Sequence, residues 1–378
     1  PAHYAGRATD YFGSEVLDAD GVPIGPVSDI AVDLSASYVP YLVVALDDGE
    51  LIMTFREAAR SRLRSHVDAR SWASMIRSSD KGNTWSASEL IYDDPDGIQD
   101  PCIMQTASGS LLVTFFKWSV ATEEELPDTP PPGRLTRTGW NGRNSAWTKG
   151  TFLVRSEDRG RTWSEDAVEV QSPLGSATLT SDPILQLDSG DLLMPLYGKR
   201  SAAETDVVAV LRSSDDGTSW GDFSIAAFDP LGNDAFLEPS LAQTPSGGII
   251  CMARAHHVLD PAKGSDSGTP EYLFRVFSED GGKTWHDLGR TPMWGHPPHV
   301  ILLADGRLLC AYGYRRPPYG VRVCLSEDGG TSWNMGDEIP LYTHGAGFDL
   351  GYPCSVQLPD RSILTAWYES SQTGVSEI

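Results

Sequence analysis

SEDGGKTW, at residues 278–285, is the stretch that decides the fold, because close variants of it recur along the chain. The other copies are SSDKGNTW at 78–85, SEDRGRTW at 156–163, SSDDGTSW at 213–220 and SEDGGTSW at 326–333. In this pattern the aspartate can cap the loop backbone, the glycine suits a position with positive φ, and the tryptophan can fill the space beneath the turn. We therefore expect five closed β-turns of one kind, whose residues are structural.

A second repeat, out of phase with the first, consists of a turn followed by an apolar strand. Its copies are residues 47–57, 107–117, 188–198, 245–255, 304–314 and 359–369, mostly about 55–60 residues apart. Short strands with glycine turns at this period are typical of a β-propeller, and no stretch has the 3.6-residue period of an amphipathic helix. The sequence predicts an all-β, six-bladed β-propeller with four strands per blade, in which residues 1–378 form one domain.

Two segments depart from the repeat. The last unit lacks the turn motif and ends shortly after its second strand. We therefore expect the N-terminal segment, up to about residue 35, to supply the missing strands and close the ring, because this would leave no open sheet edge. Blade 2 carries a proline-rich insertion at about 118–150, which predicts a loop over one face that narrows the entrance to a site.

The composition excludes several classes of partner. The chain has 52 acidic and 29 basic residues and a net charge of −23, which argues against a surface for nucleic acid or anionic membrane. Hydrophobic residues make up 40%, enough to form a core, but no apolar run reaches the roughly 18 residues of a membrane span. The N-terminus lacks the pattern of a signal peptide, so localisation stays open, with a secreted or periplasmic protein slightly preferred to a cytoplasmic one.

The cysteines give no sign of a metal site. Cys102, Cys251, Cys310, Cys324 and Cys354 are odd in number and show no ligand-like spacing. Several lie in apolar runs, where cysteine usually behaves as a small buried hydrophobic residue. We expect free thiols, with a single disulfide as the alternative, and no metal or organic cofactor.

Strand direction indicates which face carries a site. If the turn motifs lie between third and fourth strands, the starts of the first strands and the ends of the second strands meet on the opposite face, near the axis. The expected starts are Pro40, Asp100, Ser181 next to Asp182, Glu238, Pro297 with His296 and His299 beside it, and Tyr352. The expected ends are Arg56, Phe116, Tyr197, Arg254, Gly313 and Tyr368. Charged and aromatic side chains at the ends of apolar strands are typical of a binding or catalytic site.

The repeated turn and several of these residues resemble the sialidase (neuraminidase) superfamily over nearly the whole chain. Glu238 with Arg254 resembles the acidic residue and arginine of that family's fourth blade, and Arg322 resembles its next substrate arginine. Tyr352, in Leu-Gly-Tyr-Pro-Cys-Ser, resembles its nucleophilic tyrosine. Asp68 lies in the interval where the family carries its acid/base aspartate.

The resemblance implies roles for these residues. Glu238 would take the proton of Tyr352, Asp68 would protonate the leaving oxygen, and Arg254 and Arg322 would hold a substrate carboxylate. Further candidates for substrate binding are Arg56, Asp100, Asp182, Tyr197, His296 and His299. The family's first-blade arginine is absent, because residues 37–41 read Ser-Tyr-Val-Pro-Tyr; Arg56, Arg315 or Arg316 could replace it.

The sequence thus predicts an exo-acting, retaining glycoside hydrolase that releases a terminal acidic sugar from a glycan. One alternative is a glycosidase for neutral sugars such as arabinan, with carboxylates among Glu238, Asp100 and Asp182. A second is a uronate lyase that uses His296, His299 or Tyr352, and a third is a non-catalytic carbohydrate-binding propeller. Each residue also has a structural alternative: the aspartates could cap strands, and Tyr352 could be a core aromatic.

Overall fold

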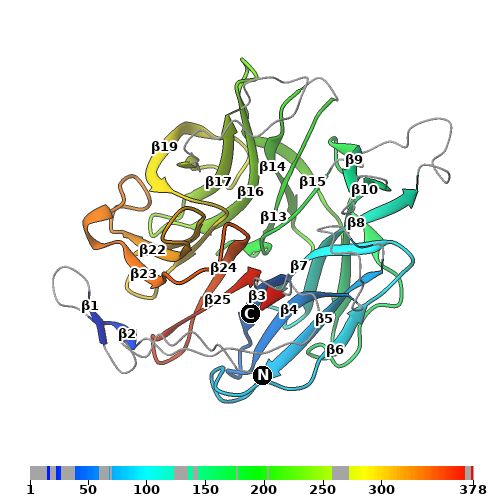
Figure 1. Ribbon diagram of the computed structural model, residues 1–378, viewed down its shortest axis with the longest axis horizontal. Helices are drawn as coiled ribbons and strands as arrows, with labels where there is room; N and C mark the ends of the chain where they lie inside the picture. The colour runs from blue at the N-terminus through cyan, green and yellow to red at the C-terminus, as the bar shows by residue number, and fades with distance from the viewer. Residues whose placement is uncertain are drawn as a thin grey trace.

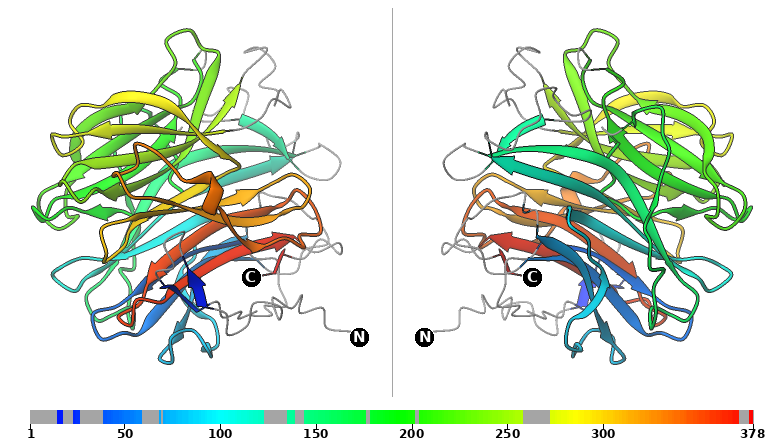
Figure 2. Two further views of the ribbon diagram at one scale, coloured as in Figure 1. Left: turned by 90° about the vertical axis from the view of Figure 1, so that its left-hand side faces the viewer. Right: turned by 90° about the vertical axis from the view of Figure 1, so that its right-hand side faces the viewer.

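The structure is a computed structural model of the chain. It describes residues 15–17, 23–26, 39–58, 68, 70–122, 135–138, 144–175, 178–201, 204–257, 272–370 and 376–377. Antiparallel sheets are arranged around an axis, with β3, β7, β16 and β24 near the middle and β6, β19 and β23 at the outside (Figure 1). The side views show the twisted sheets packed face to face around this axis (Figure 2). The arrangement is that of a β-propeller.

Five sheets are complete blades, each with four strands in sequence order from the axis outwards. Blade 1 contains β3 (Val39–Ala45), β4 (Leu51–Ala58), β5 (Ser71–Ser78) and β6 (Glu89–Tyr92). Blade 2 contains β7 (Gly97–Gln105), β8 (Leu111–Thr122), β10 (Asn144–Ser156) and β11 (Val168–Glu169), with β9 (Leu135–Thr138) as a fifth strand on β10. Blade 3 contains β12 (Leu185–Gln186), β13 (Leu192–Gly198), β14 (Val207–Ser213) and β15 (Gly221–Ala227).

Blade 4 contains β16 (Asp234–Gln243), β17 (Ile249–His257), β18 (Tyr272–Ser278) and β19 (His286–Trp294). Blade 5 contains β20 (Pro298–Leu302), β21 (Leu308–Tyr314), β22 (Gly320–Ser326) and β23 (Ile339–Tyr342), with the 3-10 helix η2 (Met335–Asp337) before β23. The last sheet has three strands, β24 (Leu350–Gln357), β25 (Ile363–Ser370) and β26 (Ser376–Glu377). Separately, β1 (Glu15–Leu17) pairs with β2 (Pro23–Pro26).

The prediction of six four-stranded blades is therefore wrong for the last sheet. The prediction that the N-terminal segment closes the ring is also wrong for the residues that the structure describes, because β1 and β2 pair with each other and with no strand of the last sheet. The last sheet instead packs between blades 5 and 1, where Leu358 joins the apolar cluster of Val43, Leu51 and Phe55. Among the described residues, apolar packing and not a strand shared between sheets joins the last sheet to blade 1.

The insertion in blade 2 differs in part from its prediction as a loop. Residues 118–122, 135–138 and 144–150 belong to strands β8, β9 and β10. Trp118 and Ala146 are buried in an apolar cluster, and Val120 packs against it, which explains why these residues extend the sheet. The prolines between 127 and 132 lie outside the described residues.

The repeated turns lie between the third and fourth strands of blades 1 to 5. In the copy at 278–285, the carboxylate of Asp280 accepts hydrogen bonds from the Thr284 N–H at 2.9 Å and the Thr284 hydroxyl at 2.6 Å. The Gly282 N–H donates to the Ser278 hydroxyl at 2.8 Å, and Gly282 has φ of 84°. Because Thr284 stabilises the ionised carboxylate, the pKa of Asp280 lies below its usual range. The polar groups of the motif thus form their hydrogen bonds within the turn itself.

Glutamine side chains join neighbouring sheets near these turns. Oε1 of Gln105, at the end of β7, accepts the Asp47 N–H of blade 1 at 3.1 Å, while its amide donates to Gly109 of its own turn at 3.4 Å. The same pair of bonds recurs between sheets at Gln186 with Ala107, Gln243 with Asp188 and Gln357 with Ala304.

The two remaining junctions lack this bond for a chemical reason. At these junctions proline, which has no N–H, occupies the turn position, as Pro245 and Pro359. The positions that would carry the glutamine are Leu302 and Ala45. Donor and acceptor are thus lost together at both junctions.

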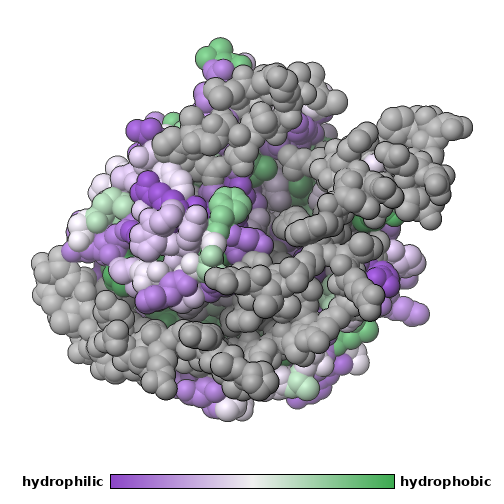
Figure 3. All heavy atoms as spheres, in the orientation of Figure 1, coloured by the Kyte–Doolittle hydropathy of each residue, from purple (hydrophilic) through white to green (hydrophobic). Residues whose placement is uncertain are grey.

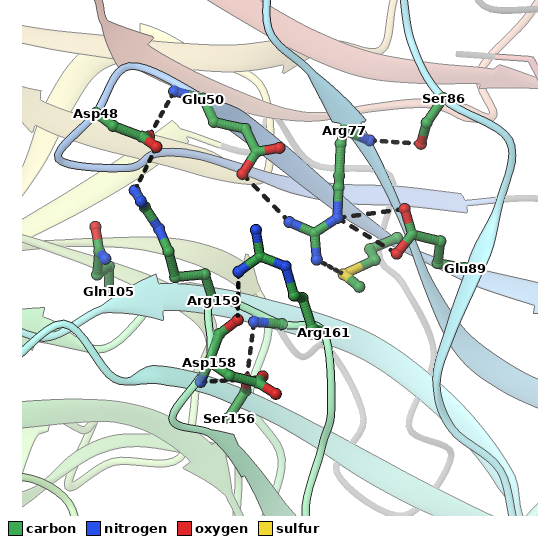
Figure 4. Close-up of polar contacts among 12 residues, drawn as sticks. Asp48, Glu50, Arg77, Ser86, Glu89, Gln105, Ser156, Asp158, Arg159 and Arg161 are labelled. Atoms are coloured by element: carbon green, nitrogen blue, oxygen red, sulfur yellow. Dashed lines mark hydrogen bonds and ion pairs between the residues drawn. The ribbon is translucent and has the colours of Figure 1, made fainter.

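Ion pairs on the same face add to these junctions (Figure 4). Arg159, in the turn of blade 2, lies 2.6 Å from Asp47 and 2.7 Å from Asp48 of blade 1, whereas Arg77 and Glu50, 3.4 Å apart, form an ion pair within blade 1. Lys81 of blade 1 lies 2.5 Å from Asp360 of the last sheet. The turn face therefore holds the blades together, which agrees with a structural role.

Within the described part of the chain, no helix has the length and apolar character needed to cross a bilayer.

Candidate functional site

Three side chains from two sheets meet near the axis. The hydroxyl of Tyr352, in β24, donates a hydrogen bond of 2.5 Å to Oε1 of Glu238, in β16. A guanidinium nitrogen of Arg254, in β17, lies 3.2 Å and 3.1 Å from the two carboxylate oxygens of Glu238. Glu238 is buried, and the other two residues are partly buried. The ring thus brings together residues that are far apart in the sequence.

Asp100, Glu238 and Tyr352 share an unusual backbone conformation. Their φ angles are 52°, 49° and 47°, and each residue directly precedes a proline. Each also lies at a break in the register between the first and second strands of its sheet. A bulge redirects a side chain, and proline fits a strand position that donates no ladder hydrogen bond. Such strained positions are most common at functional sites.

The surroundings push the pKa values of Glu238 and Tyr352 apart. Burial by itself raises the pKa of the Glu238 carboxyl, but the charge of Arg254, the hydrogen bond from Tyr352 and the charges of His296 and Arg315 outweigh it and lower the pKa to about 2. Burial and the nearby charge of Glu238 raise the pKa of the Tyr352 hydroxyl well above its usual range. At neutral pH, Glu238 is therefore ionised and Tyr352 keeps its proton.

Arg315 is the cation next to the tyrosine. Its Nε donates to the Leu350 carbonyl at 2.7 Å, another nitrogen lies 3.4 Å from the Tyr368 hydroxyl, and the guanidinium carbon lies 5.6 Å from the centre of the Tyr352 ring. In the described part of the chain it forms no ion pair with a carboxylate. The sequence points to Arg315 only as a substitute for the missing first-blade arginine. The signal for its position is that it directly follows the second strand of blade 5, whereas Arg56 and Arg254 lie inside the second strands of blades 1 and 4, towards their ends.

Arg322, which the sequence predicts to bind a substrate carboxylate, lies beside a glutamate in the structure. It forms an ion pair with Glu338, which also accepts a hydrogen bond from the Tyr312 hydroxyl. Its guanidinium carbon lies 3.5 Å from the centre of the Tyr314 ring. Arg254 and Arg322 are therefore each paired with a separate glutamate, and their role in holding a substrate carboxylate stays a prediction.

Asp100, Tyr197 and His296 lie close enough to the pair to influence it electrostatically. The charges of Asp100 and Tyr197 contribute to the raised pKa of Tyr352, and that of His296 contributes to the lowered pKa of Glu238. All three side chains are buried. They come from blade 2, blade 3 and the start of blade 5, so the site draws on most of the ring.

Arg56 ends the corresponding strand of blade 1 and is also buried. It shares a face of β4 with Thr54, whose hydroxyl donates to the carbonyl of Pro101 at 2.7 Å. Since Pro101 follows Asp100, this face of β4 packs against the strand that carries Asp100. The structure thus places Arg56 on the side of blade 1 that faces blade 2.

Asp182 and His299 form a second, buried polar cluster. Oδ1 of Asp182 lies 3.9 Å from Nε2 of His299, whose Nδ1 accepts the Ser355 N–H at 3.2 Å. Burial raises the pKa of Asp182 well above its usual range, although hydrogen bonds from Ser240 and Leu241 oppose the shift. Burial also lowers the pKa of His299 to about 4. These contacts connect blades 3, 4 and 5 with the last sheet.

Asp68 precedes β5 and is partly exposed. Its Oδ1 accepts the Arg70 N–H at 2.9 Å, and its carbonyl accepts the Ser71 hydroxyl at 2.8 Å. Residues 59–67 and 69 are outside the described residues, including His66. The contacts of Asp68 in the structure are thus those of a cap on its own turn.

No group of three or more His, Cys, Asp or Glu residues in the described part of the chain is placed to hold a metal ion. All five cysteines are buried and free, so the disulfide alternative does not apply.

Fold and site define a β-propeller of the sialidase-like class. Residues 72–364 match the family described as BNR repeat-like domain, and the chain belongs to this family. The resemblance to the sialidase superfamily is therefore confirmed at the level of family and fold. No curated protein gives a significant match in sequence.

Several solved structures are similar to the chain. A protein of unknown function from Dyadobacter fermentans DSM 18053 is 26% identical, with 93% of this chain and 96% of that chain covered and a TM-score of 0.75. The Hadza microbial sialidase Hz136 is 19% identical, with coverage of 96% and 71% and a TM-score of 0.65. An α-L-arabinanase of Penicillium chrysogenum, complexed with arabinobiose, is 15% identical, with coverage of 92% and 97% and a TM-score of 0.61. The last two likenesses concern the fold.

Proposed function

We propose that this protein is a glycoside hydrolase in which Tyr352 is the nucleophile and Glu238 is its base. The observation that carries the proposal is the hydrogen bond of 2.5 Å from the Tyr352 hydroxyl to the carboxylate of Glu238. The guanidinium of Arg254 lies 3.1 Å from the same carboxylate. A nucleophile within hydrogen-bond reach of a base that a third group orients is the arrangement expected of covalent catalysis. The sialidase and arabinanase among the similar folds support a carbohydrate substrate.

In the proposed reaction, the oxygen of Tyr352 bonds to the anomeric carbon while the glycosidic bond breaks. The tyrosine proton passes to Glu238, and Asp68 gives a proton to the leaving oxygen. Water then attacks the same carbon while its bond to the Tyr352 oxygen breaks, Asp68 takes a proton from the water, and the proton on Glu238 returns to Tyr352. Two displacements at one carbon retain its configuration.

The pKa values constrain how the proton moves. A carboxyl with a pKa of about 2 is a weak base towards a tyrosine whose pKa is raised well above its usual range. Transfer before attack is therefore unfavourable, and the proton moves together with formation of the new C–O bond. A substrate carboxylate bound to Arg254 would weaken the stabilisation that Arg254 gives to the ionised form of Glu238. The pKa of Glu238 would then rise, and Glu238 would be a stronger base.

We propose an acidic terminal sugar as substrate, with its carboxylate at Arg315 and Arg254. Arg315 is nearly buried, lies beside Tyr352 and forms no ion pair in the described part of the chain. A buried cation of this kind suits a ligand carboxylate. This assignment replaces Arg322 by Arg315 as the second arginine.

A neutral sugar is the second candidate. Arg254 and Arg322 are already matched by Glu238 and Glu338, and the first-blade arginine is absent. In that case Glu238 and Asp100 would act as a pair of carboxylates, and the distance between them with substrate bound would decide the stereochemistry.

A screen of products tests both candidates. Purified protein is incubated with sialosides, arabinan and uronate polymers, and released monosaccharides and unsaturated uronates are measured. Release of an acidic monosaccharide with retained configuration supports the first candidate, and release of arabinose supports the second. Unsaturated products would show a lyase, and binding without any product would show a carbohydrate-binding propeller; either result would overturn the proposed hydrolase.

A further inference from the structure

Phe348 is an aromatic residue on the rim of the candidate site. Its relative exposure is 54%, and among the described phenylalanines only Phe228 is also exposed. It belongs to residues 343–349, which connect β23 of blade 5 to β24, the strand that carries Tyr352. The face shown in Figure 3 is mainly hydrophilic where residues are described, with a small hydrophobic strip near the middle. Covering an exposed phenyl ring with a ligand is favourable, because it removes apolar surface from water.

The ring lies close to the reactive pair. The guanidinium carbon of Arg315 is 5.3 Å from the centre of the Phe348 ring and 5.6 Å from the centre of the Tyr352 ring. Arg315 therefore lies near both the exposed phenyl ring and the proposed nucleophile. A ligand bound at Arg315 and Tyr352 would lie near Phe348.

The connection that carries Phe348 is firmly held. The Gly345 N–H donates to the Tyr319 carbonyl at 3.0 Å, the Ala346 N–H donates to Glu369 at 2.5 Å, and Glu369 also accepts the Tyr342 hydroxyl at 2.7 Å. A Cβ at Gly345 would lie 2.5 Å from the side chain of Leu350, so the packing is close.

The end of the connection that adjoins β24 is held as well. The Tyr368 hydroxyl donates to Asp349 at 2.7 Å, and Arg315 donates to the Leu350 carbonyl at 2.7 Å. Side chains of β25, together with Arg315 after β21, thus hold the backbone on both sides of Phe348. The exposure of its ring is built into the fold, and a preformed surface costs little entropy on binding.

From these contacts we infer that Phe348 is the platform of a leaving-group subsite, on which the apolar face of the sugar next to the scissile bond stacks. The inference rests on the proposed hydrolase function and deepens it: the substrate is an oligosaccharide or glycan with a second sugar ring. A ring that is more than half exposed contacts the part of the ligand farther from the buried Glu238. Aromatic stacking contributes roughly threefold to tenfold to affinity.

The test compares two substrates of the same terminal sugar, identified in the product screen: the oligosaccharide and the glycosyl fluoride, whose leaving group has no ring. Phe348→Ala is expected to lower kcat/KM for the oligosaccharide about threefold to tenfold and to change that for the fluoride less than about twofold. Phe348→Trp is expected to keep the activity on the oligosaccharide. Thermal melting of each variant shows that it is folded.

Phe228 provides the matched control. It is 42% exposed and lies 5.5 Å from the guanidinium carbon of Arg200, but it follows β15, the outer strand of blade 3. Phe228→Ala should leave both substrates unaffected. An equal loss on both substrates in Phe348→Ala would place the ring against the reacting sugar, and no loss on either would give it no role; both results overturn the subsite. Wild-type protein that hydrolyses no glycan would refute the hydrolase itself, a separate outcome.

Discussion

Glu238 and Tyr352 have nearly the same backbone geometry, with φ of 49° and 47°, and each directly precedes a proline. The two residues come from β16 and β24, and the hydroxyl of one lies 2.5 Å from the carboxylate of the other. A left-handed conformation costs a residue with a side chain about 1 kcal/mol or more. Because both residues adopt this unfavourable backbone conformation, we infer that the orientation of their side chains matters to function.

Replacement of Tyr352 by phenylalanine tests the proposed nucleophile. Tyr352→Phe is expected to lower kcat by about 10²-fold to 10⁴-fold, because the attacking oxygen is lost while the ring remains. Activity on the identified glycan and thermal melting are the measurements. Tyr92→Phe is the control, since Tyr92 also donates its hydroxyl to a carboxylate, Asp94, at 3.2 Å, but lies in the outer strand of blade 1. Equal activity of the two variants would refute the role of Tyr352.

Acid should destabilise the protein through His299. Its pKa is lowered from 6.5 to about 4 in the folded state, so between these values the unfolded chain binds the proton more tightly. This stability is complete above about pH 6.5 and is lost as the pH falls towards 4. Between pH 7 and pH 4.5 the loss is about 2–3 kcal/mol.

Urea unfolding of wild type and His299→Gln at the two pH values measures this contribution. Because the pKa of Asp182 is raised, its contribution to stability changes in the opposite direction as the pH falls. The prediction therefore concerns the difference in free energy of unfolding between the wild type and His299→Gln. Wild type should lose more free energy of unfolding than the variant on acidification. Parallel losses in both proteins would show that His299 does not titrate as expected.

An exchange of side chains tests the glutamine junctions. Gln105→Leu should lower the free energy of unfolding by about 1 kcal/mol, because the Asp47 N–H loses its acceptor. Leu302→Gln, at the equivalent position of blade 5, should gain nothing, since Pro245 offers no N–H. Midpoints of urea unfolding check both. A stabilised Leu302→Gln variant would contradict the explanation.

The turn tryptophans should affect stability and not catalysis. Trp333 is buried in the apolar cluster between blades 4 and 5, so Trp333→Ala should cost about 3–5 kcal/mol. The protein that stays folded should keep its kcat, because the turn face lies opposite the candidate site. A variant with unchanged melting and lost turnover would be inconsistent with this.

Gly320 is expected to be irreplaceable at the start of β22. A Cβ there would lie 1.7 Å from the Tyr342 carbonyl oxygen, so Gly320→Ala should destabilise the protein by about 3 kcal/mol or more. Gly221 starts β15 and has open space at the same atom; Gly221→Ala should change stability by less than about 0.5 kcal/mol. Thermal melting distinguishes the two.

The sequence by itself determined the repeated turns and the propeller class, because these depend on contacts within a few residues. Ser278, Asp280 and Thr284 satisfy one another inside a single turn, and the alternation of turn and strand repeats along the chain. Such local chemistry looks the same in every copy. The sequence also predicts Glu238, Arg254 and Tyr352 on one face at the starts and ends of strands, whereas in the structure Glu238 lies inside β16 at a break in its register.

Tertiary structure alone decided which of the candidates meet. Arg315 directly follows β21 and Arg322 lies in β22 of the same blade. Arg322 nevertheless pairs with Glu338, whereas Arg315 lies against Tyr352. The bulges before the prolines redirect side chains, and a shift of one residue in register turns a side chain to the other face. Among the described residues the last sheet has three strands, and β1 and β2 pair with each other and not with it. Pairing between distant strands sets these outcomes, and local sequence does not encode it.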